Sequence, residues 1–330
     1  MSKVADLYSL SPASDTEHEA IARVCKAAGD PLRLQVLHAL RHDSYGVLEL
    51  CRIFDVRQPA LSHHLKVLAE AGLVSRRREG TTIFYRRALP AEQPGLELLL
   101  QGMFGTVDRC LESEQVREGI EAIQAERAES SRSFFAEHAA KFAEQQELIA
   151  PPDQYKAQLL QILEHCSGGQ RKALELGPGE GWLLPELIAR YAKVEGWDNS
   201  PQMLATATRY CADIDPERLT LRCGDSRDAS AVGAQHDLVV ANMVLHHTPS
   251  PADVIADLAK CLNTDGTLLI NDLCAHDQAW AREACGDLWL GFEPEQLNAW
   301  ANAAGLKAGE SIYLALRNGF RVQMRLFHIR

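Results

Sequence analysis

The sequence predicts an α+β unit of short helices with one hairpin, followed by an α/β unit with a parallel sheet. Up to about residue 90 helical stretches dominate, whereas from about residue 172 short apolar runs alternate with helical stretches. Such alternation is typical of a parallel sheet covered by its crossover helices. Between the two patterns, residues 96–149 are rich in Glu, Gln, Ala and Arg at helical spacing, and Pro151 and Pro152 end the run. We therefore expect a helical connector between two domains.

The composition fits a protein with two apolar cores. The 330 residues are 46% hydrophobic and 24% charged. No basic cluster followed by an apolar run is present near residue 1, and no stretch approaches the roughly 20 apolar residues of a membrane span. We expect a cytoplasmic protein with no membrane partner. The nine cysteines are scattered and form no C-x-x-C pair, so we expect reduced thiols and no metal site.

The net charge of -11 is unevenly distributed. Residues 1–90 contain thirteen Lys and Arg against ten Asp and Glu, a net charge of +3, which leaves -14 for residues 91–330. A basic module attached to an acidic body is typical of a chain in which one domain faces phosphate groups. The first domain is therefore the candidate for nucleic-acid binding.

Residues 57–74, RQPALSHHLKVLAEAGLV, predict one helix. Pro59 suits a first helical turn, and Gly72 suits a helix stop. At 100° per residue Leu61, Leu65 and Leu68 share one face, which we expect to be buried. His64 falls at the edge of that face. The opposite face carries Pro59, Ser62, His63 and Lys66.

That opposite face carries donors that can reach base edges and phosphates in a major groove, and Arg57 and Gln58 precede it at the positive end of the helix. Residues 75–85, SRRREGTTIFY, then predict a hairpin with Gly80 at its turn. Its three arginines would lie on the phosphate backbone. The predicted DNA contacts are Arg57, Gln58, Ser62, His63, Lys66, Arg76, Arg77 and Arg78.

These segments, together with AGDPLRLQVL at residues 28–37, resemble the ArsR family of winged-helix repressors over about residues 17–88. The resemblance implies a winged helix-turn-helix that binds double-stranded operator DNA as a homodimer. The alternative is a basic helix that is merely solvated. Many members of the family sense metals through a cysteine pair in the preceding helix, but here that segment, LELCRIF at residues 48–54, contains only Cys51. One thiol does not complete a soft-metal site, so we interpret Cys51 as a small buried apolar residue, and a metal-responsive repressor is the less favoured alternative.

The domain boundaries follow from these patterns. We expect a winged helix-turn-helix over residues 1–90, a helical connector over 91–152 and an α/β domain over 153–330. Apolar positions of the connector, such as Leu98 and Phe104, bury either against a partner chain or against their own domain. The expected strands of the last domain are residues 172–176, 193–197, 219–223, 237–241 and 267–271.

A glycine-rich loop, ELGPGEG at residues 175–181, follows the first expected strand and precedes a helix. Such glycines form a tight turn that lets the backbone approach a ligand. Asp198 follows at the end of the next strand, where a carboxylate accepts ribose hydroxyls. Dinucleotide folds favour G-x-G-x-x-G, whereas this loop is G-x-G-x-G with an acid in front of it. Glu175 repels phosphate but suits the sulfonium or the amino group of S-adenosylmethionine.

The segments at residues 175–181, 197–203, 224–226, 237–245 and 264–270 resemble class I methyltransferases, which have a Rossmann-like fold. The resemblance implies that S-adenosylmethionine or S-adenosylhomocysteine is held by the glycine loop, by the acid after the second strand and by Gly224-Asp225, with Met203 packed on the adenine. An empty structural fold is the alternative. The predicted cofactor-binding residues are Glu175, Gly177, Gly179, Gly181, Asp198, Asn199, Met203, Asp225, Ser226 and Asn242.

Two further segments bear on this pocket. Residues 133–142 resemble the N-terminal helix that covers the cofactor in small-molecule methyltransferases, which makes Phe135, His138 and Phe142 pocket candidates. An amphipathic helix with a surface histidine is the alternative. His246, His247, Asp272 and His276 qualify by position near the expected sulfonium, and His246, Asp272 and His276 are the catalytic candidates. Packing is the favoured interpretation of any one of them in this fold.

Other reactions are disfavoured by what the sequence lacks. The Asp-Pro-Pro-Tyr and Asn-Pro-Pro-Tyr motifs of nucleic-acid amino methylation are absent. No closely spaced set of cysteines suits arsenic methylation. Residues 272–330 resemble the ends of fused ArsR-methyltransferase proteins, a group that includes S-adenosylhomocysteine-responsive regulators of methionine-cycle genes. The sequence therefore favours a repressor that senses the cofactor or its product, and an active small-molecule methyltransferase with a DNA-binding domain stays open as the alternative.

Overall fold

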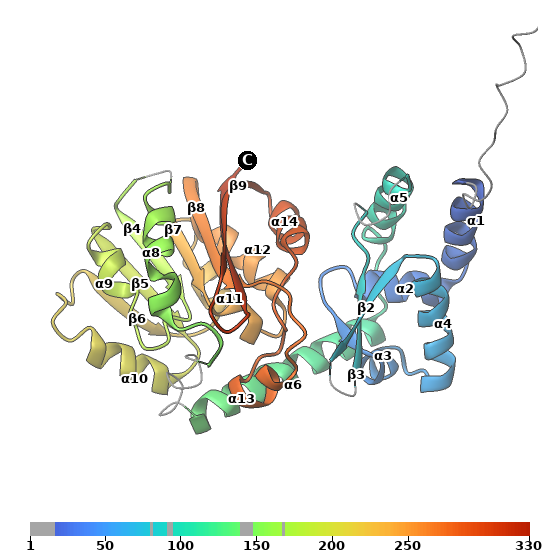
Figure 1. Cartoon of the computed structure of the whole chain (residues 1–330), viewed down its shortest axis with the longest axis horizontal. Helices are drawn as coiled ribbons and strands as arrows, with labels where there is room; N and C mark the ends of the chain where they lie inside the picture. Colours follow the sequence, from blue (N-terminus) through green and yellow to red (C-terminus); the bar gives the residue numbers. More distant parts are fainter. Residues whose placement is uncertain (1–16, 80–81, 91–94, 139–147, 167–168) are drawn as a thin grey trace, which may run out of the picture. The chain divides into compact units, whose positions relative to one another are not determined.

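The computed structural model describes residues 17–79, 82–90, 95–138, 148–166 and 169–330 (Figure 1). The chain divides into two compact units, Met1–Ile120 and Glu121–Arg330. The expected connector is shared between them, because helix α5 (Glu97–Val107) belongs to the first unit while helix α6 (Glu114–His138) begins in the first and ends in the second. Within the described residues no helix is both long and apolar enough to cross a membrane.

The first unit combines short helices with a three-stranded sheet in the order β1-β3-β2. Its remaining elements are α1 (Glu17–Ala28), α2 (Pro31–Ala39), β1 (Tyr45–Gly46), α3 (Val47–Phe54), α4 (Gln58–Glu70), β2 (Val74–Glu79) and β3 (Thr82–Arg87).

Helix α4 is the predicted recognition helix, and its apolar face is buried as expected. Leu61, Leu65 and Leu68 are all 0% exposed. Pro59 lies in the first turn, and Gly72 after the helix has a φ of 71°, a left-handed conformation that glycine adopts without strain. The next two strands form the predicted hairpin, with Arg76 opposite Tyr85 and Arg78 opposite Ile83. Its predicted turn residue Gly80 lies outside the described residues.

Strand β1 was not predicted. It has only two residues and pairs antiparallel with β3, placing Tyr45 opposite Tyr85. Tyr45 is fully buried and donates a hydrogen bond to Oδ2 of Asp43 over 2.9 Å. A two-residue strand has too short a pattern for periodicity to reveal it.

The second unit is built on a seven-stranded sheet in the order β6-β5-β4-β7-β8-β10-β9 (Figure 1). The first five strands in this order are parallel, and β10 and β9 are antiparallel additions at one edge. The strands are β4 (Lys172–Leu176), β5 (Lys193–Asp198), β6 (Leu219–Cys223), β7 (His236–Asn242), β8 (Leu262–Leu273), β9 (Leu306–Ala315) and β10 (Arg321–Ile329).

All five expected strands are confirmed, whereas the antiparallel pair was not foreseen. Helices cover both faces of the sheet: they are α8 (Pro152–Leu163), α9 (Leu184–Ile188), α10 (Pro201–Tyr210), α11 (Ser226–Ala231), the 3₁₀ helix η3 (Leu245–His247), α12 (Pro251–Cys261), α13 (Trp280–Cys285) and α14 (Pro294–Ala303).

Neighbouring residues of the central strands belong to two separate cores. In β4, Ala173 packs with the cluster that contains Tyr155 of α8, and Leu174 packs with the cluster that contains Ile255 of α12. This follows from the alternation of side chains along a strand. A sheet covered on both faces leaves the carboxyl ends of its parallel strands as the place where ligands bind in open α/β folds.

Candidate functional site

The glycine loop after β4 has the backbone that only glycine adopts easily. Gly177 has a φ of 66° and Gly181 a φ of 91°. A Cβ on Gly177 would overlap Cγ2 of Val244, and a Cβ on Gly181 would lie 3.1 Å from Cα of Ala207. The nitrogen of Gly177 donates to the carbonyl oxygen of Trp197 over 2.7 Å. The loop is therefore held close to the ends of its neighbouring strands.

A cavity of about 810 Å³ lies at these strand ends, within the second unit. Its volume is within the range of sites that take cofactor-sized molecules. Eight of the ten predicted cofactor residues line it, namely Gly177, Gly179, Asp198, Asn199, Met203, Asp225, Ser226 and Asn242. Glu175 and Gly181 are not among the lining residues.

Asp198 at the end of β5 is fixed by backbone donors. The nitrogen of Ser200 donates to its Oδ1 over 2.8 Å. Burial raises the pKa of the Asp198 carboxyl to about 6, while hydrogen bonds from the backbone of Ser200 and Gly179 act in the opposite direction. A positioned carboxylate on the cavity wall is the group expected to accept ribose hydroxyls.

Glu175 is 1% exposed, and its Oε2 has no hydrogen-bond partner among the described residues. Burial, and then the charge of Asp198, raise the pKa of this carboxyl to about 8. An unsatisfied buried acid is costly unless a donor or cation approaches it. An ionised Glu175 would therefore favour a positively charged group near the glycine loop.

Asp225 lines the cavity but is already engaged. Its carboxylate accepts from the backbone of Arg227 over 2.9 Å and forms an ion pair of 3.0 Å with the Arg227 guanidinium. Burial acts to raise the pKa of Asp225, but these bonds outweigh it and lower the pKa. Among the lining residues seven carboxylates face three Lys or Arg side chains, which disfavours a polyphosphate ligand and favours a cation.

Helix α6 closes one side of the cavity. Gln124, Ser131 and Phe135 line it, and the Ser131 hydroxyl donates to the carbonyl oxygen of His247 over 3.1 Å. The ring of Phe135 packs edge-on against His247, with 4.9 Å between centroids. Phe135 therefore lines the cavity, as the prediction of a covering helix implied. Phe142 lies outside the described residues, and the structure does not describe the His138 side chain.

The three catalytic candidates are not brought together at the cavity, because the described lining contains none of them. His246 and Asp272 are buried and hydrogen-bonded to each other, with 2.7 Å between Nδ1 and Oδ1. His276 packs against the ring of Phe320 with 4.8 Å between centroids. The histidine that lines the cavity is instead His247, which the sequence did not single out from its neighbour.

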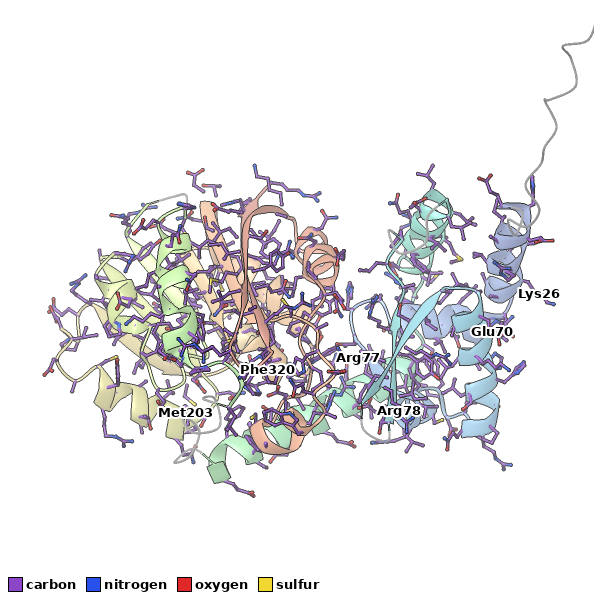
Figure 2. All side chains as sticks on the ribbon, in the orientation of Figure 1. Lys26, Glu70, Arg77, Arg78, Met203 and Phe320 are labelled. Atoms are coloured by element: carbon purple, nitrogen blue, oxygen red, sulfur yellow. The ribbon has the colours of Figure 1, made fainter. Side chains whose placement is uncertain are left out.

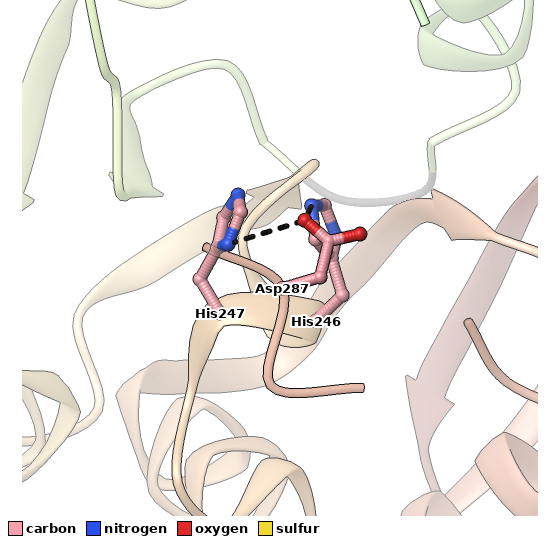
Figure 3. Close-up of side chains that lie close together, drawn as sticks. All are labelled: His246, His247 and Asp287. Atoms are coloured by element: carbon pink, nitrogen blue, oxygen red, sulfur yellow. Dashed lines mark ion pairs between the residues drawn. The ribbon is translucent and has the colours of Figure 1, made fainter. Parts of the chain in front are cut away.

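His247 and His246 also converge with a buried carboxylate that sequence reasoning missed, Asp287 (Figure 3). The Asp287 Oδ1 lies 3.7 Å from Nδ1 of His247 and 3.9 Å from Nε2 of His246. Burial, and then the charge of His246, lower the pKa of His247, so its ring is neutral. No sequence spacing signals this cluster, because Asp287 comes from a distant loop after α13.

In the first unit the predicted DNA-contact face is solvent-accessible. Arg57, Gln58, His63 and Lys66 are exposed, and Ser62 is half-buried. On the hairpin Arg76 and Arg78 are exposed and Arg77 is half-buried; Figure 2 labels Arg77 and Arg78. Consecutive strand residues point to opposite faces, so Arg76 and Arg78 share one face.

The surroundings of Cys51 in α3 and His64 in α4 are those of residues with a structural role. Cys51 is half-buried, and burial raises the pKa of its thiol, which disfavours the thiolate that a metal requires. Nδ1 of His64 lies 3.6 Å from Oδ1 of Asp30, the residue that caps α2.

Comparison with known proteins assigns each unit to a family. Residues 30–76 match the model described as "Bacterial regulatory protein, arsR family", and residues 173–266 match the model described as "Methyltransferase domain". An uncharacterised HTH-type transcriptional regulator of Methanocaldococcus jannaschii is 43% identical over 72 residues, 21% of this chain and 79% of that protein. The biofilm growth-associated repressor of Agrobacterium fabrum is 42% identical over 77 residues, 23% of this chain and 66% of the repressor.

The second unit has its own relatives. A ubiquinone biosynthesis O-methyltransferase of Methylococcus capsulatus is 26% identical over 158 residues, 44% of this chain and 67% of that enzyme. Among solved structures, the N-methyltransferase NodS from Bradyrhizobium japonicum in complex with S-adenosyl-L-homocysteine has 15% identity and a TM-score of 0.49, covering 61% of this chain and 100% of the other. The chain belongs to the arsR family of DNA-binding transcriptional regulators, and its helix-turn-helix domain is fused to a methyltransferase domain.

Proposed function

We propose that this regulator binds S-adenosylmethionine or S-adenosylhomocysteine in the cavity of its second unit, and that the ligand changes its affinity for operator DNA. The observation that carries the proposal is the gathering of the glycine loop, Asp198 and Met203 around one cavity of about 810 Å³. The same chain carries an exposed recognition helix and a basic hairpin. A sensor needs this combination of a ligand site and a DNA-binding site.

The residues fit the ligand in two respects. The seven carboxylates that line the cavity suit a ligand with a cationic amino or sulfonium group. Glu175 does not line the cavity, but its charge adds to theirs when its carboxyl is ionised. The left-handed Gly177, whose missing side chain leaves its backbone accessible, suits close approach by the methionine part of the ligand. Asp198 would hold the ribose, and Met203 would pack on the adenine.

A ligand regulates DNA binding only if it has different affinities for two states of the protein. We infer that the regulator is a homodimer whose two recognition helices read the halves of a palindrome, so that a change in dimer geometry changes the fit to both half-sites at once. Couplings of this kind change affinity by roughly 5-fold to 150-fold.

The test is a fluorescence-anisotropy titration of the full chain against a duplex obtained by in vitro selection. S-adenosylmethionine and S-adenosylhomocysteine are added in separate arms. We expect one of them to change the DNA affinity by at least about 5-fold. Asp198→Asn is expected to lose the response, whereas Asp213→Asn, an exposed carboxylate away from the cavity, keeps it. Equal DNA affinity in all arms contradicts regulation by this ligand.

A second candidate function is methyl transfer to a small hydroxylated molecule. It is favoured by His247, a neutral imidazole on the cavity wall that can accept a proton from an acceptor hydroxyl. The similarity to O-methyltransferases makes hydroxyl compounds the first acceptors to test. Incubation with methyl-labelled S-adenosylmethionine and a set of catechols and phenols would detect turnover. Loss of a general base is expected to slow it by about 10²-fold to 10⁴-fold in His247→Gln.

A further inference from the structure

Three buried side chains converge beside the cavity (Figure 3). His246 and His247 come from η3, and Asp287 follows α13. One ligating atom from each lies within 4.8 Å of the other two. In a tetrahedral site with metal-ligand bonds of about 2.0–2.1 Å, neighbouring ligand atoms are about 3.4 Å apart. The distances of 3.7 and 3.9 Å from Asp287 Oδ1 to the two histidines require only a small contraction.

Asp272 orients one of these ligands. Its Oδ1 accepts from Nδ1 of His246 over 2.7 Å, and its Oδ2 accepts from the nitrogen of Leu245 over 3.0 Å. Since Nδ1 carries the proton, the other ring nitrogen, Nε2, is the one that faces Asp287. A carboxylate bonded to the far nitrogen of a histidine is the arrangement that surrounds most metal-bound histidines.

The Asp287 side chain is the observation that calls for a ligand. It is 0% exposed, and neither of its oxygens has a hydrogen-bond partner in the described part of the chain. The charges of His246 and Arg282 act on Asp287 without donating a hydrogen bond to its oxygens. A divalent cation that displaces the Nε2 proton of His246 would instead bind this carboxylate directly. The separations to the histidines are also too long for hydrogen bonds.

We propose that His246, His247 and Asp287 bind one divalent transition-metal ion of the zinc class. Two imidazoles and one carboxylate are borderline ligands that suit Zn²⁺ and Fe²⁺, and they disfavour Mg²⁺ and Ca²⁺, which prefer all-oxygen sites. Binding through Nδ1 of His247 moves its proton to Nε2 and releases a long hydrogen bond of 3.3 Å to the carbonyl oxygen of Gly286. A metal-bound His247 cannot also be the general base for methyl transfer, so the metal site and that role are alternatives. The metal site does not depend on which organic ligand fills the cavity.

The site has a consequence for the cavity. His247 lines the cavity and Asp287 does not, so an ion shared by the two fixes the loop after α13 against the cavity wall. Metal occupancy is therefore expected to change the affinity of whatever the cavity binds, and the site supplies a second input to the regulator. Removing the ion would loosen the packing between η3 and that loop.

The test is Zn²⁺ binding by the full-length protein after treatment with a chelator. Equilibrium dialysis in competition with a chromophoric chelator gives the affinity and stoichiometry. We expect one tight site in the wild type and a loss of more than about 100-fold in Asp287→Asn, beyond the upper end of what an outer-sphere substitution costs. Asp272→Asn is expected to lose about 10-fold to 100-fold. His165→Gln, an exposed histidine outside the cluster, is the matched control and should bind normally.

Co²⁺ is the second probe, because its absorption spectrum depends on the types of its ligands. The spectrum reports these ligands even when a variant is slightly less stable than the wild type. Nitrogen and oxygen ligands give visible bands without the near-ultraviolet thiolate band that cysteine would add. We expect the visible bands to disappear in His247→Gln and to persist in Cys285→Ser. A thiolate band, no tight site in the folded wild type, or equal Zn²⁺ affinity in Asp287→Asn and wild type would overturn the proposal.

Discussion

His246 and Asp272 form a buried hydrogen bond of 2.7 Å that joins η3 to the end of β8. Burial acts to lower the pKa of His246, but the charges of Asp272 and Asp287 outweigh it and raise the pKa to about 9. In the metal-free protein His246 is therefore an imidazolium at neutral pH. This hydrogen bond orders the segment that places His247 on the cavity wall.

Replacing Asp272 by Asn should destabilise the metal-free protein by about 3 kcal/mol or more at pH 6.5, because a buried charged group loses its partner. A raised histidine pKa contributes stability that is fully present below about 6.5 and is lost as the pH rises through about 9. The cost of Asp272→Asn should therefore shrink between pH 6.5 and 9.5. Urea unfolding in the presence of chelator measures both, with Asp213→Asn as control. An equal cost at both pH values would contradict a charged His246.

We expect the Glu175 carboxyl to destabilise the folded protein when it is ionised. Its pKa is raised to about 8, so the folded state holds a proton that the unfolded chain releases near pH 4.5. Stability therefore falls as the pH rises from about 4.5 to 8. At about 1.4 kcal/mol per pKa unit the effect amounts to a few kcal/mol.

We expect Glu175→Gln to be more stable than the wild type at pH 8 and to show a flatter dependence of the unfolding free energy on pH. The same variant should bind S-adenosylmethionine more weakly, since it lacks a negative charge that attracts the cation. Calorimetric titration at pH 6 and 8 completes the test, because binding to the ionised carboxylate should strengthen with pH in the wild type alone. Parallel pH dependences in both proteins would contradict this role for Glu175.

Much of this arrangement was predictable because it is local in sequence. Three leucines at helical spacing between Pro59 and Gly72 indicate the recognition helix. The glycine loop is indicated by its position after a strand. The sequence did not predict features that depend on packing between distant segments, such as which side chains face the cavity. Whether His246 or His247 faces the cavity depends on the turn of a three-residue 3₁₀ helix.

Asp287 shows the same limit. It joins the histidines through a fold-dependent contact between distant segments, and no spacing in the sequence indicates it. Asp225 differs in another respect, because the structure adds to this predicted cofactor-binding residue an ion pair with Arg227, which the sequence did not indicate. The antiparallel strands β9 and β10 lack the alternation with helices by which the parallel strands were recognised.

The hairpin predicts a salt-dependent contribution to DNA affinity. Arg78 is exposed on β2 and faces the same side as Arg76. If each binds one phosphate, Arg78→Ala should lower the slope of log affinity against log salt by about 0.9 for the phosphate that it leaves unneutralised, and by about twice that in a dimer. Binding should weaken for operator and random duplexes alike. Anisotropy at several salt concentrations measures the slope. Arg209→Ala, exposed on the second unit, should leave it unchanged.

The dimer prediction rests on apolar side chains that the first unit leaves in solvent. Leu98 on α5 is 85% exposed and Ile21 on α1 is 41% exposed, whereas Leu100 and Phe104 of α5 are buried in their own unit. Helix α5 therefore uses one face for its own core and keeps Leu98 outside it. In a two-fold interface each substitution acts twice, so a charge at this position is strongly unfavourable.

Leu98→Glu should shift the protein from dimer to monomer and weaken operator binding, because one monomer contacts a single half-site. Sedimentation equilibrium measures the first effect and anisotropy the second. Leu148→Glu, which alters an exposed leucine of the second unit, is the control and should remain dimeric. If Leu98→Glu remained a dimer with full operator affinity, helix α5 would not form the interface. A monomeric wild type would refute the two-fold model of operator recognition, because the basic hairpins could then act only one at a time.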